Sequence, residues 1–204
     1  MGAMDYFICL VSAIVMIIGG YQFYFFVQKH HYRPAREFNT RLDDRIPFWP
    51  SWVWIDSGLY YPIILLLVFT QPSFQSFNYT AFSFLVLLAM QFAVFYFFPV
   101  RIPAHWHRYQ PDGSLSLRML AFVHRFDKYD NSIPSMHVSV ATLTALHLHA
   151  TLPQSLGNWL LLAFLFPLLI SMSALFTKQH YVADILPGAV FGWIAYVFTN
   201  WLLS

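Results

Sequence analysis

Residues 177–184 read Thr-Lys-Gln-His-Tyr-Val-Ala-Asp and stand between two long apolar runs. Within this stretch His180 and Asp184 are four residues apart. Residues with this spacing share one face of a helix, so the carboxylate can reach the imidazole. An imidazole oriented in this way can act as a nucleophile, a base or a metal ligand. The stretch is therefore a candidate reactive centre, and the chain is organised around it and one other motif.

The other motif is Pro-Ser-Met-His at residues 134–137, at the start of another apolar run. Proline ends the preceding loop, and the first backbone N–H groups of a helix lack partners, which favours binding of an anion such as phosphate. A protonated His137 beside that anion can act as a general acid. Alone, so short a motif favours a hydrogen-bonded core histidine. Together with His180 it favours a functional site, because ionisable groups inside a membrane protein are functional candidates.

The composition indicates a membrane protein. Hydrophobic residues make up 58% of the 204 residues and charged residues only 10%, against about 25% charged in soluble domains. The one cysteine, Cys9, lies in an apolar run, so disulfides contribute nothing. Because no repeat or linker is visible, we expect residues 1–204 to form a single domain.

Six segments are long and apolar enough to cross a bilayer, for which about 20 residues suffice. They are residues 6–26, 52–69, 79–98, 135–152, 159–176 and 182–203. The first has no basic flank and no cleavage site, so we expect a retained helix rather than a signal peptide. The fourth is interrupted by polar residues and should face the bundle interior. The sequence thus predicts an all-α, six-transmembrane-helix bundle with short interfacial helices in the first and third loops, the latter near residues 114–124.

All eleven basic residues fall in the first, third and fifth loops. An up-and-down topology therefore places both histidine motifs on the same charged face. The positive-inside rule would make this face cytoplasmic. Some of the cations are also expected to bind an anion. Asp56, at the start of the second span, is expected to form a structural salt bridge with an arginine of the first loop. The basic residues are Lys29, Arg33, Arg36, Arg41, Arg45, Arg101, Arg108, Arg118, Arg125, Lys128 and Lys178.

These motifs resemble those of a known family. Residues 134–137 look like the second signature, and Ser173 followed by His180 and Asp184 looks like the third signature, of the phosphatidic acid phosphatase type 2 superfamily. Its members are integral-membrane lipid phosphatases and phosphotransferases. The runs 98–103, 127–137 and 177–181 are most similar to the branch that includes inositol phosphorylceramide synthase-like proteins.

The resemblance implies a role for each matched residue. His180 would attack phosphorus and form a phosphohistidine, while Asp184 orients and charges it. His137 would protonate the leaving oxygen, and Ser135 with the following backbone, at Met136, would hold phosphate oxygens. The two histidines and the aspartate could also bind a metal by ligand type, but the neighbouring cations oppose this. The resemblance implies no metal and no other cofactor.

The sequence departs from the family pattern at a phosphate ligand. The third signature normally has an arginine directly after its serine, but here Ser173 is followed by Ala174. We expect Arg101, Lys178 and Arg125 to supply the positive charge instead, although lysine lacks the bidentate fork of arginine.

These features lead to three functional hypotheses. The first is an enzyme that hydrolyses a membrane lipid phosphate monoester or pyrophosphate, of the phosphatidic acid or polyprenyl-phosphate type. The second is a phosphotransferase that moves a phospho-headgroup between lipids or to an acceptor alcohol. The third is a non-catalytic lipid-binding membrane protein, supported by Ala174. The expected partners are a lipid phosphate and the bilayer, without nucleic acid, and the oligomeric state stays open. By resemblance to bacterial relatives we expect the inner membrane, with the catalytic face extracytoplasmic.

Overall fold

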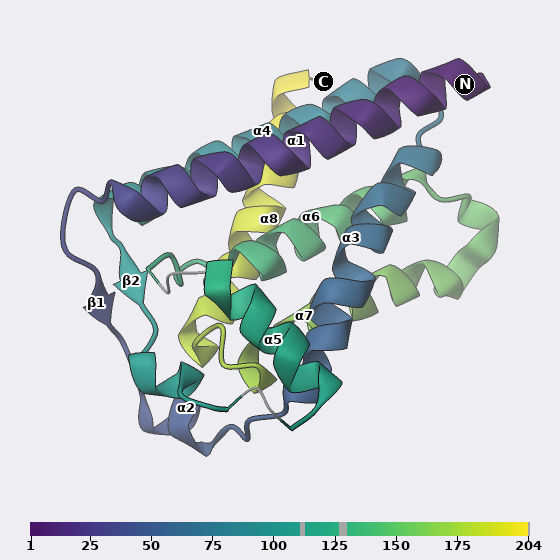
Figure 1. Ribbon diagram of the computed structural model, residues 1–204. Helices are drawn as coiled ribbons and strands as arrows, with labels where there is room; N and C mark the ends of the chain where they lie inside the picture. Colours follow the sequence, from purple (N-terminus) through teal and green to yellow (C-terminus); the bar gives the residue numbers. More distant parts are fainter. Residues whose placement is uncertain (111–112, 127–129, 204) are drawn as a thin grey trace.

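The computed structural model describes residues 1–110, 113–126 and 130–203. In this part of the chain helices account for almost all regular structure, and the expected all-α class is confirmed (Figure 1). The α-helices are α1 (Ala3–Lys29), α2 (Arg41–Arg45), α3 (Val53–Phe69), α4 (Phe74–Phe97), α5 (Leu115–Phe126), α6 (Met136–Thr151), α7 (Leu165–Phe176) and α8 (Val182–Leu203). Short 3₁₀ segments are η1 (Pro50–Trp52), η2 (Ala104–His107) and η3 (Gln154–Phe164).

Five helical segments are long and apolar enough to span a membrane, so the chain is a multi-pass integral membrane protein. They are Ala3–Lys29, Pro50–Phe69, Phe74–Phe97, Gln154–Phe176 and Val182–Leu203. The fourth expected span, residues 135–152, is not confirmed as a membrane-spanning helix. Its segment forms α6, which has 16 residues and is therefore about 24 Å long, shorter than the roughly 30 Å of bilayer hydrocarbon.

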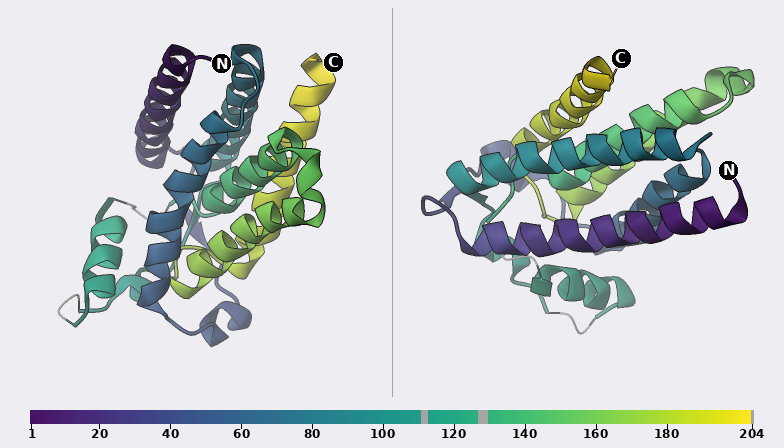
Figure 2. Two further views of the ribbon diagram at one scale, coloured as in Figure 1. Left: turned by 90° about the vertical axis from the view of Figure 1, so that its right-hand side faces the viewer. Right: turned by 90° about the horizontal axis from the view of Figure 1, so that it is seen from above.

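Helix α6 lies inside the bundle, which explains how it tolerates so many polar residues. It packs against α3, α4, α7 and α8, and Ser139, Thr144 and His147 on it are buried. His147 lies 2.6 Å from the Ser83 hydroxyl of α4, so its polar atoms have a partner inside the bundle. Figures 1 and 2 show α1 and α4 side by side, with α6 between α4 and α7. The expectation that this segment faces the interior is confirmed.

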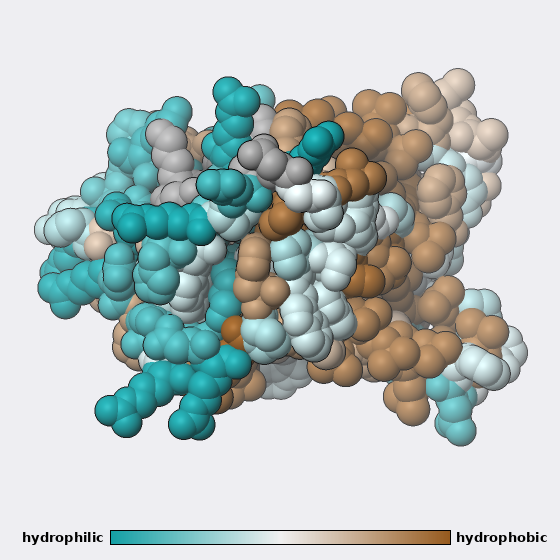
Figure 3. All heavy atoms as spheres, turned by 60° about the horizontal axis from the view of Figure 1, so that its bottom comes forward, coloured by the Kyte–Doolittle hydropathy of each residue, from teal (hydrophilic) through white to brown (hydrophobic). Residues whose placement is uncertain are grey.

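The first, third and fifth loops meet at one end of the bundle (Figure 1). There the strands β1 (Arg36–Glu37) and β2 (Val100–Arg101) form a parallel pair, with Arg36 opposite Val100. Helix α2 lies in the first loop and α5 in the third, so both expected loop helices are present. Hydrophilic side chains gather at this end of the molecule, and hydrophobic ones cover the other part (Figure 3).

Candidate active site

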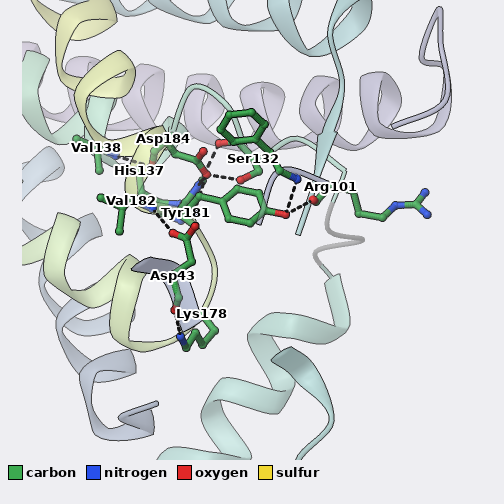
Figure 4. A network of polar contacts seen from close by, with 12 residues as sticks. Asp43, Arg101, Ser132, His137, Val138, Lys178, Tyr181, Val182 and Asp184 are labelled. Carbon is green, nitrogen blue, oxygen red and sulfur yellow. Dashed lines mark hydrogen bonds and ion pairs between the residues drawn. The ribbon is translucent and has the colours of Figure 1, made fainter. Parts of the chain in front are cut away.

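His180 is held by a fully buried carboxylate at the start of α8. Its Nδ1–H points to Asp184 Oδ2 at 3.1 Å and to the backbone carbonyl of Ser132, also at 3.1 Å. The same carboxylate oxygen accepts the Tyr181 N–H at 2.9 Å and the Ser132 hydroxyl (Figure 4). With Nδ1 as the donor, Nε2 of His180 carries the lone pair. The predicted contact between His180 and Asp184 is therefore present, and it fixes the ring.

His137 reaches the same point from the first turn of α6. Its Nδ1 lies 3.5 Å from Nε2 of His180, although the two residues are 43 positions apart in the chain. The ring planes are at 71° to each other. The topology thus brings the two imidazoles together, as we expected from the common face of the two motifs.

The loop that carries His180 is anchored to the first loop. Asp43 of α2 is buried, and its Oδ1 accepts the Val182 N–H at 2.8 Å. Its backbone carbonyl accepts a hydrogen bond from Lys178 Nζ at 2.6 Å. Lys178 has a φ of 59°, a left-handed conformation that is uncommon for a residue with a side chain. This turn directs the ammonium group toward Asp43 and over the Trp106 ring.

The third loop provides a second anchor. The Tyr181 hydroxyl donates to the Arg101 carbonyl at 2.5 Å and accepts from the Phe38 N–H at 3.2 Å. Burial raises the pKa of Tyr181 to about 12, so this hydroxyl remains a donor at physiological pH. Hydrogen bonds that Asp43 accepts and that Tyr181 donates and accepts therefore connect all three loops around His180.

Two of the expected phosphate ligands have other partners in this structure. The Lys178 ammonium is directed toward Asp43, away from His137 (Figure 4), and burial lowers its pKa. The Arg101 guanidinium donates to both carboxylate oxygens of Asp130, at 2.5 and 3.1 Å, and this pairing raises its pKa. Its side chain extends away from the site in Figure 4. Sequence could not anticipate these partners, because each is supplied by a remote segment.

The other expected ligands lie closer to the reactive groups. Ser135 is fully buried, and its hydroxyl caps α6 by accepting the Val138 N–H at 3.4 Å. Met136 lines a cavity in front of the histidines. Arg125 is exposed in the last turn of α5, a helix whose apolar side chains line the same cavity. Ala174, where the family pattern has arginine, is fully buried.

A cavity of about 390 Å³ opens in front of His137 and His180. No lysine or arginine of the described chain lines it, whereas Gln179 and Asn131 do. A second, apolar cavity of about 110 Å³ adjoins it between α1, α3, α4 and α6. Both cavities are lined by Tyr21, Tyr60, Tyr61 and Met136.

The prediction for Asp56 is wrong. Its carboxylate is buried, and Oδ1 lies 3.8 Å from Nε2 of His137 rather than beside an arginine of the first loop. One signal was available, because Asp56 is an acidic residue inside an apolar span. No comparable signal in the sequence points to Ser132, Gln179 or Asp43, because their roles depend on packing between distant loops.

A family model described as the PAP2 superfamily matches residues 51–198. The chain belongs to the PAP2 superfamily. The match runs from the start of α3 through most of α8 and so includes both histidines and Asp184. Searches of curated proteins and of solved structures gave no match.

PAP2 superfamily membership indicates phosphatase or phosphotransferase chemistry. Across the described ranges, no group of three or more His, Cys, Asp or Glu residues has an arrangement that could hold a metal ion.

Proposed function

We propose that this chain is a lipid phosphatase that hydrolyses a membrane lipid phosphate monoester or pyrophosphate through a phosphohistidine on His180. The observation that carries the proposal is the orientation of His180. Its Nδ1 is bonded to the buried Asp184, and its Nε2 faces His137 beside an open cavity. A nucleophile, its orienting carboxylate and an acid are therefore arranged around one point.

The reaction proceeds in two displacements. Nε2 of His180 attacks phosphorus, the bond from phosphorus to the leaving oxygen breaks, and His137 gives that oxygen a proton. Asp184 stabilises the positive charge that the phosphorylated ring acquires. Water then attacks the phosphohistidine while His137 accepts a proton, and inorganic phosphate leaves. His180 returns to its starting state.

The phosphate group would be bound chiefly by neutral donors. The backbone N–H groups of Met136 and His137 begin α6, and Ser135 fixes that helix start. Gln179 is 6% exposed and lines the cavity, and its amide nitrogen has no hydrogen-bond partner among the described residues. Arg125, one turn beyond cavity-lining residues of α5, would supply a cation by reorienting its side chain. In this proposal Arg101 and Lys178 hold the loops in place.

The substrate's hydrocarbon chain would extend into the apolar cavity. That cavity adjoins the site cavity through Tyr21, Tyr60, Tyr61 and Met136, and its walls expose almost only apolar atoms. A lipid with its phosphate at His180 can thus keep its chain among the helices, out of water. The shared wall of the two cavities supports a lipid phosphate over a soluble phosphate ester. We further propose that the site faces the extracytoplasmic side of a bacterial inner membrane.

The test is release of inorganic phosphate by the purified protein in detergent, from phosphatidic acid and from a polyprenyl pyrophosphate. His180→Ala should reduce turnover by roughly 10³-fold or more, because removing a nucleophile leaves only binding and the oxyanion contacts. The matched control is His105→Ala, an exposed histidine outside the cavity, which should behave as the wild type. Circular dichroism and gel filtration check that both variants are folded.

Three outcomes would lead to a different conclusion. Product formed only when an acceptor alcohol is added would favour the phosphotransferase. Wild-type turnover that survives His180→Ala would contradict the phosphohistidine mechanism. Lipid binding without turnover under any of these conditions would favour the non-catalytic lipid-binding protein.

A further inference from the structure

Asp56 of α3 is a buried acid that the reaction above does not use. It is 5% exposed and lies in the wall of the site cavity. Its Oδ1 has no hydrogen-bond partner among the described residues, and Nε2 of His137 lies 3.8 Å away. Burying an ionised carboxylate costs free energy unless a cation or donors compensate. A protonated His137 is the cation within reach.

We propose that Asp56 is a positioning residue that holds His137 in the orientation of a general acid, an inference that rests on the proposed function. The two nitrogens of His137 face different groups: Nε2 faces Asp56, and Nδ1 faces His180. A carboxylate at Nε2 keeps one proton there. The proton on Nδ1 is then the one directed at the leaving oxygen of a phosphate on His180.

The site would therefore contain two histidine–aspartate pairs with opposite tasks. In the pair of His180 and Asp184, the carboxylate takes the Nδ1–H and leaves Nε2 free to attack. In the pair of His137 and Asp56, the carboxylate faces Nε2 and leaves Nδ1 to donate. His180 and Asp184 are four residues apart in the sequence, at the start of α8. Asp56 and His137 instead come from two different helices, α3 and α6.

Among the described residues, no carboxylate other than that of Asp56 lies beside His137. The side chains around it that can titrate are His180, with Asp184 behind it, and the tyrosines of the cavity wall. The Tyr60 ring lies 5.3 Å from the His137 ring, centroid to centroid. The cavity-lining tyrosines are Tyr21 and Tyr24 of α1 and Tyr60 and Tyr61 of α3. Because neutral phenols cannot balance an imidazolium charge, Asp56 is the group that can do so.

The test compares two leaving groups in the Asp56→Asn variant. Loss of acid catalysis should lower kcat for phosphatidic acid, which has an alkoxide leaving group, by about 10²-fold. For a polyprenyl pyrophosphate, whose leaving phosphate needs little protonation, kcat should fall much less. Asp56→Glu should recover part of the loss. The matched control is Asp44→Asn, which removes an exposed acid of α2 and should leave both rates unchanged.

A double substitution separates positioning from structural support. Asp56→Asn should cost little more activity in a His137→Ala background, because the group it positions is gone. The inference is overturned if Asp56→Asn leaves kcat unchanged or lowers kcat equally for both substrates. It is also overturned if Asp56→Asn lowers kcat by its full factor in the His137→Ala background. Should Asp56→Asn fail to fold, the leaving-group ratio of Asp56→Glu decides in the same way. Wild-type activity of His180→Ala would instead reject the phosphatase mechanism itself.

Discussion

His124 is a buried histidine outside the reaction centre that links α5 to the loops. Its ring stacks on His107 with 3.6 Å between centroids, and its Nδ1 lies 2.9 Å from the Tyr109 hydroxyl. Burial, and to a smaller extent the neighbouring His107, lowers the pKa of His124 from 6.5 to about 2. The folded protein therefore keeps this ring neutral at pH values where the unfolded chain protonates it.

This difference predicts acid sensitivity. Below about pH 6.5 the unfolded chain binds a proton that the folded protein does not, so stability present above that pH is lost as pH falls. The midpoint of thermal unfolding in detergent should drop between about pH 7.5 and about pH 5.5. The midpoint of the His124→Gln variant should drop less, because glutamine can form hydrogen bonds but does not titrate. An equal drop in both proteins would show that His124 does not cause the sensitivity.

At the residue scale, sequence predicts contacts that form within one segment. The i, i+4 spacing of His180 and Asp184 is sufficient to predict their contact, because the start of a helix determines the distance between them. The directions of Lys178 and Arg101 could not be predicted, since the Asp43 carbonyl and the Asp130 carboxylate come from other loops. The predicted partner of Asp56 is wrong because the neighbour of this residue across the bundle depends on how α3 packs.

The packing of α8 on α6 depends on two glycines. A Cβ added at Gly188 would lie 2.8 Å from the Ser135 carbonyl oxygen, and one at Gly192 would overlap the Ser139 carbonyl and lie 3.0 Å from Thr142 Cβ. Side chains at these positions would push apart the helices that carry His137 and Asp184. Close approach of these helices is therefore a condition for the site geometry.

We expect Gly192→Ala to destabilise the protein by about 1–3 kcal/mol, the usual cost of overpacking. It should also lower turnover, because α8 carries the carboxylate that orients His180. Gly19→Ala on α1 is the control, since a Cβ there meets nothing within 4 Å. Thermal unfolding and phosphate release measure both effects. A Gly192→Ala protein as stable as the control would show that α8 can shift without cost.

At the element scale, the hydrophobic runs predict where helices lie. The length of a run does not predict whether its helix is long enough to span the membrane. Five expected spans correspond to long apolar helices. The fourth expected span became the 16-residue α6, because its polar residues are satisfied by other helices rather than placed against lipid. The pair β1–β2 is two residues long in each strand, too short to leave a periodic pattern.

At the scale of the whole molecule, the charges predict which loops meet. Every basic residue lies in the first, third or fifth loop, and the structure places these loops at one end (Figure 1). The shared end could be predicted from the alternation of apolar runs and from the basic residues in every second loop. The shape of the cavities could not, because it depends on side chains from several helices.

The orientation of this end can be measured by cysteine labelling. In a Cys9→Ser background, Ser114→Cys in the third loop should react with a membrane-impermeant thiol reagent on intact cells, if the site is extracytoplasmic. Ser155→Cys, at the opposite end, is the control and should react only after permeabilisation. The reverse pattern would place the site in the cytoplasm, as the positive-inside rule predicts.

The most direct test of the central claim is to trap the phosphoenzyme. The protein is mixed with a polyprenyl pyrophosphate, quenched in alkali within milliseconds and digested, and the phosphorylated peptide is identified by mass spectrometry. We predict phosphohistidine at His180. Its level should be higher in His137→Ala, because the water that hydrolyses the phosphohistidine then has no general base. A turning-over enzyme with phosphate on another residue, or with none at His180 in either protein, would contradict the account.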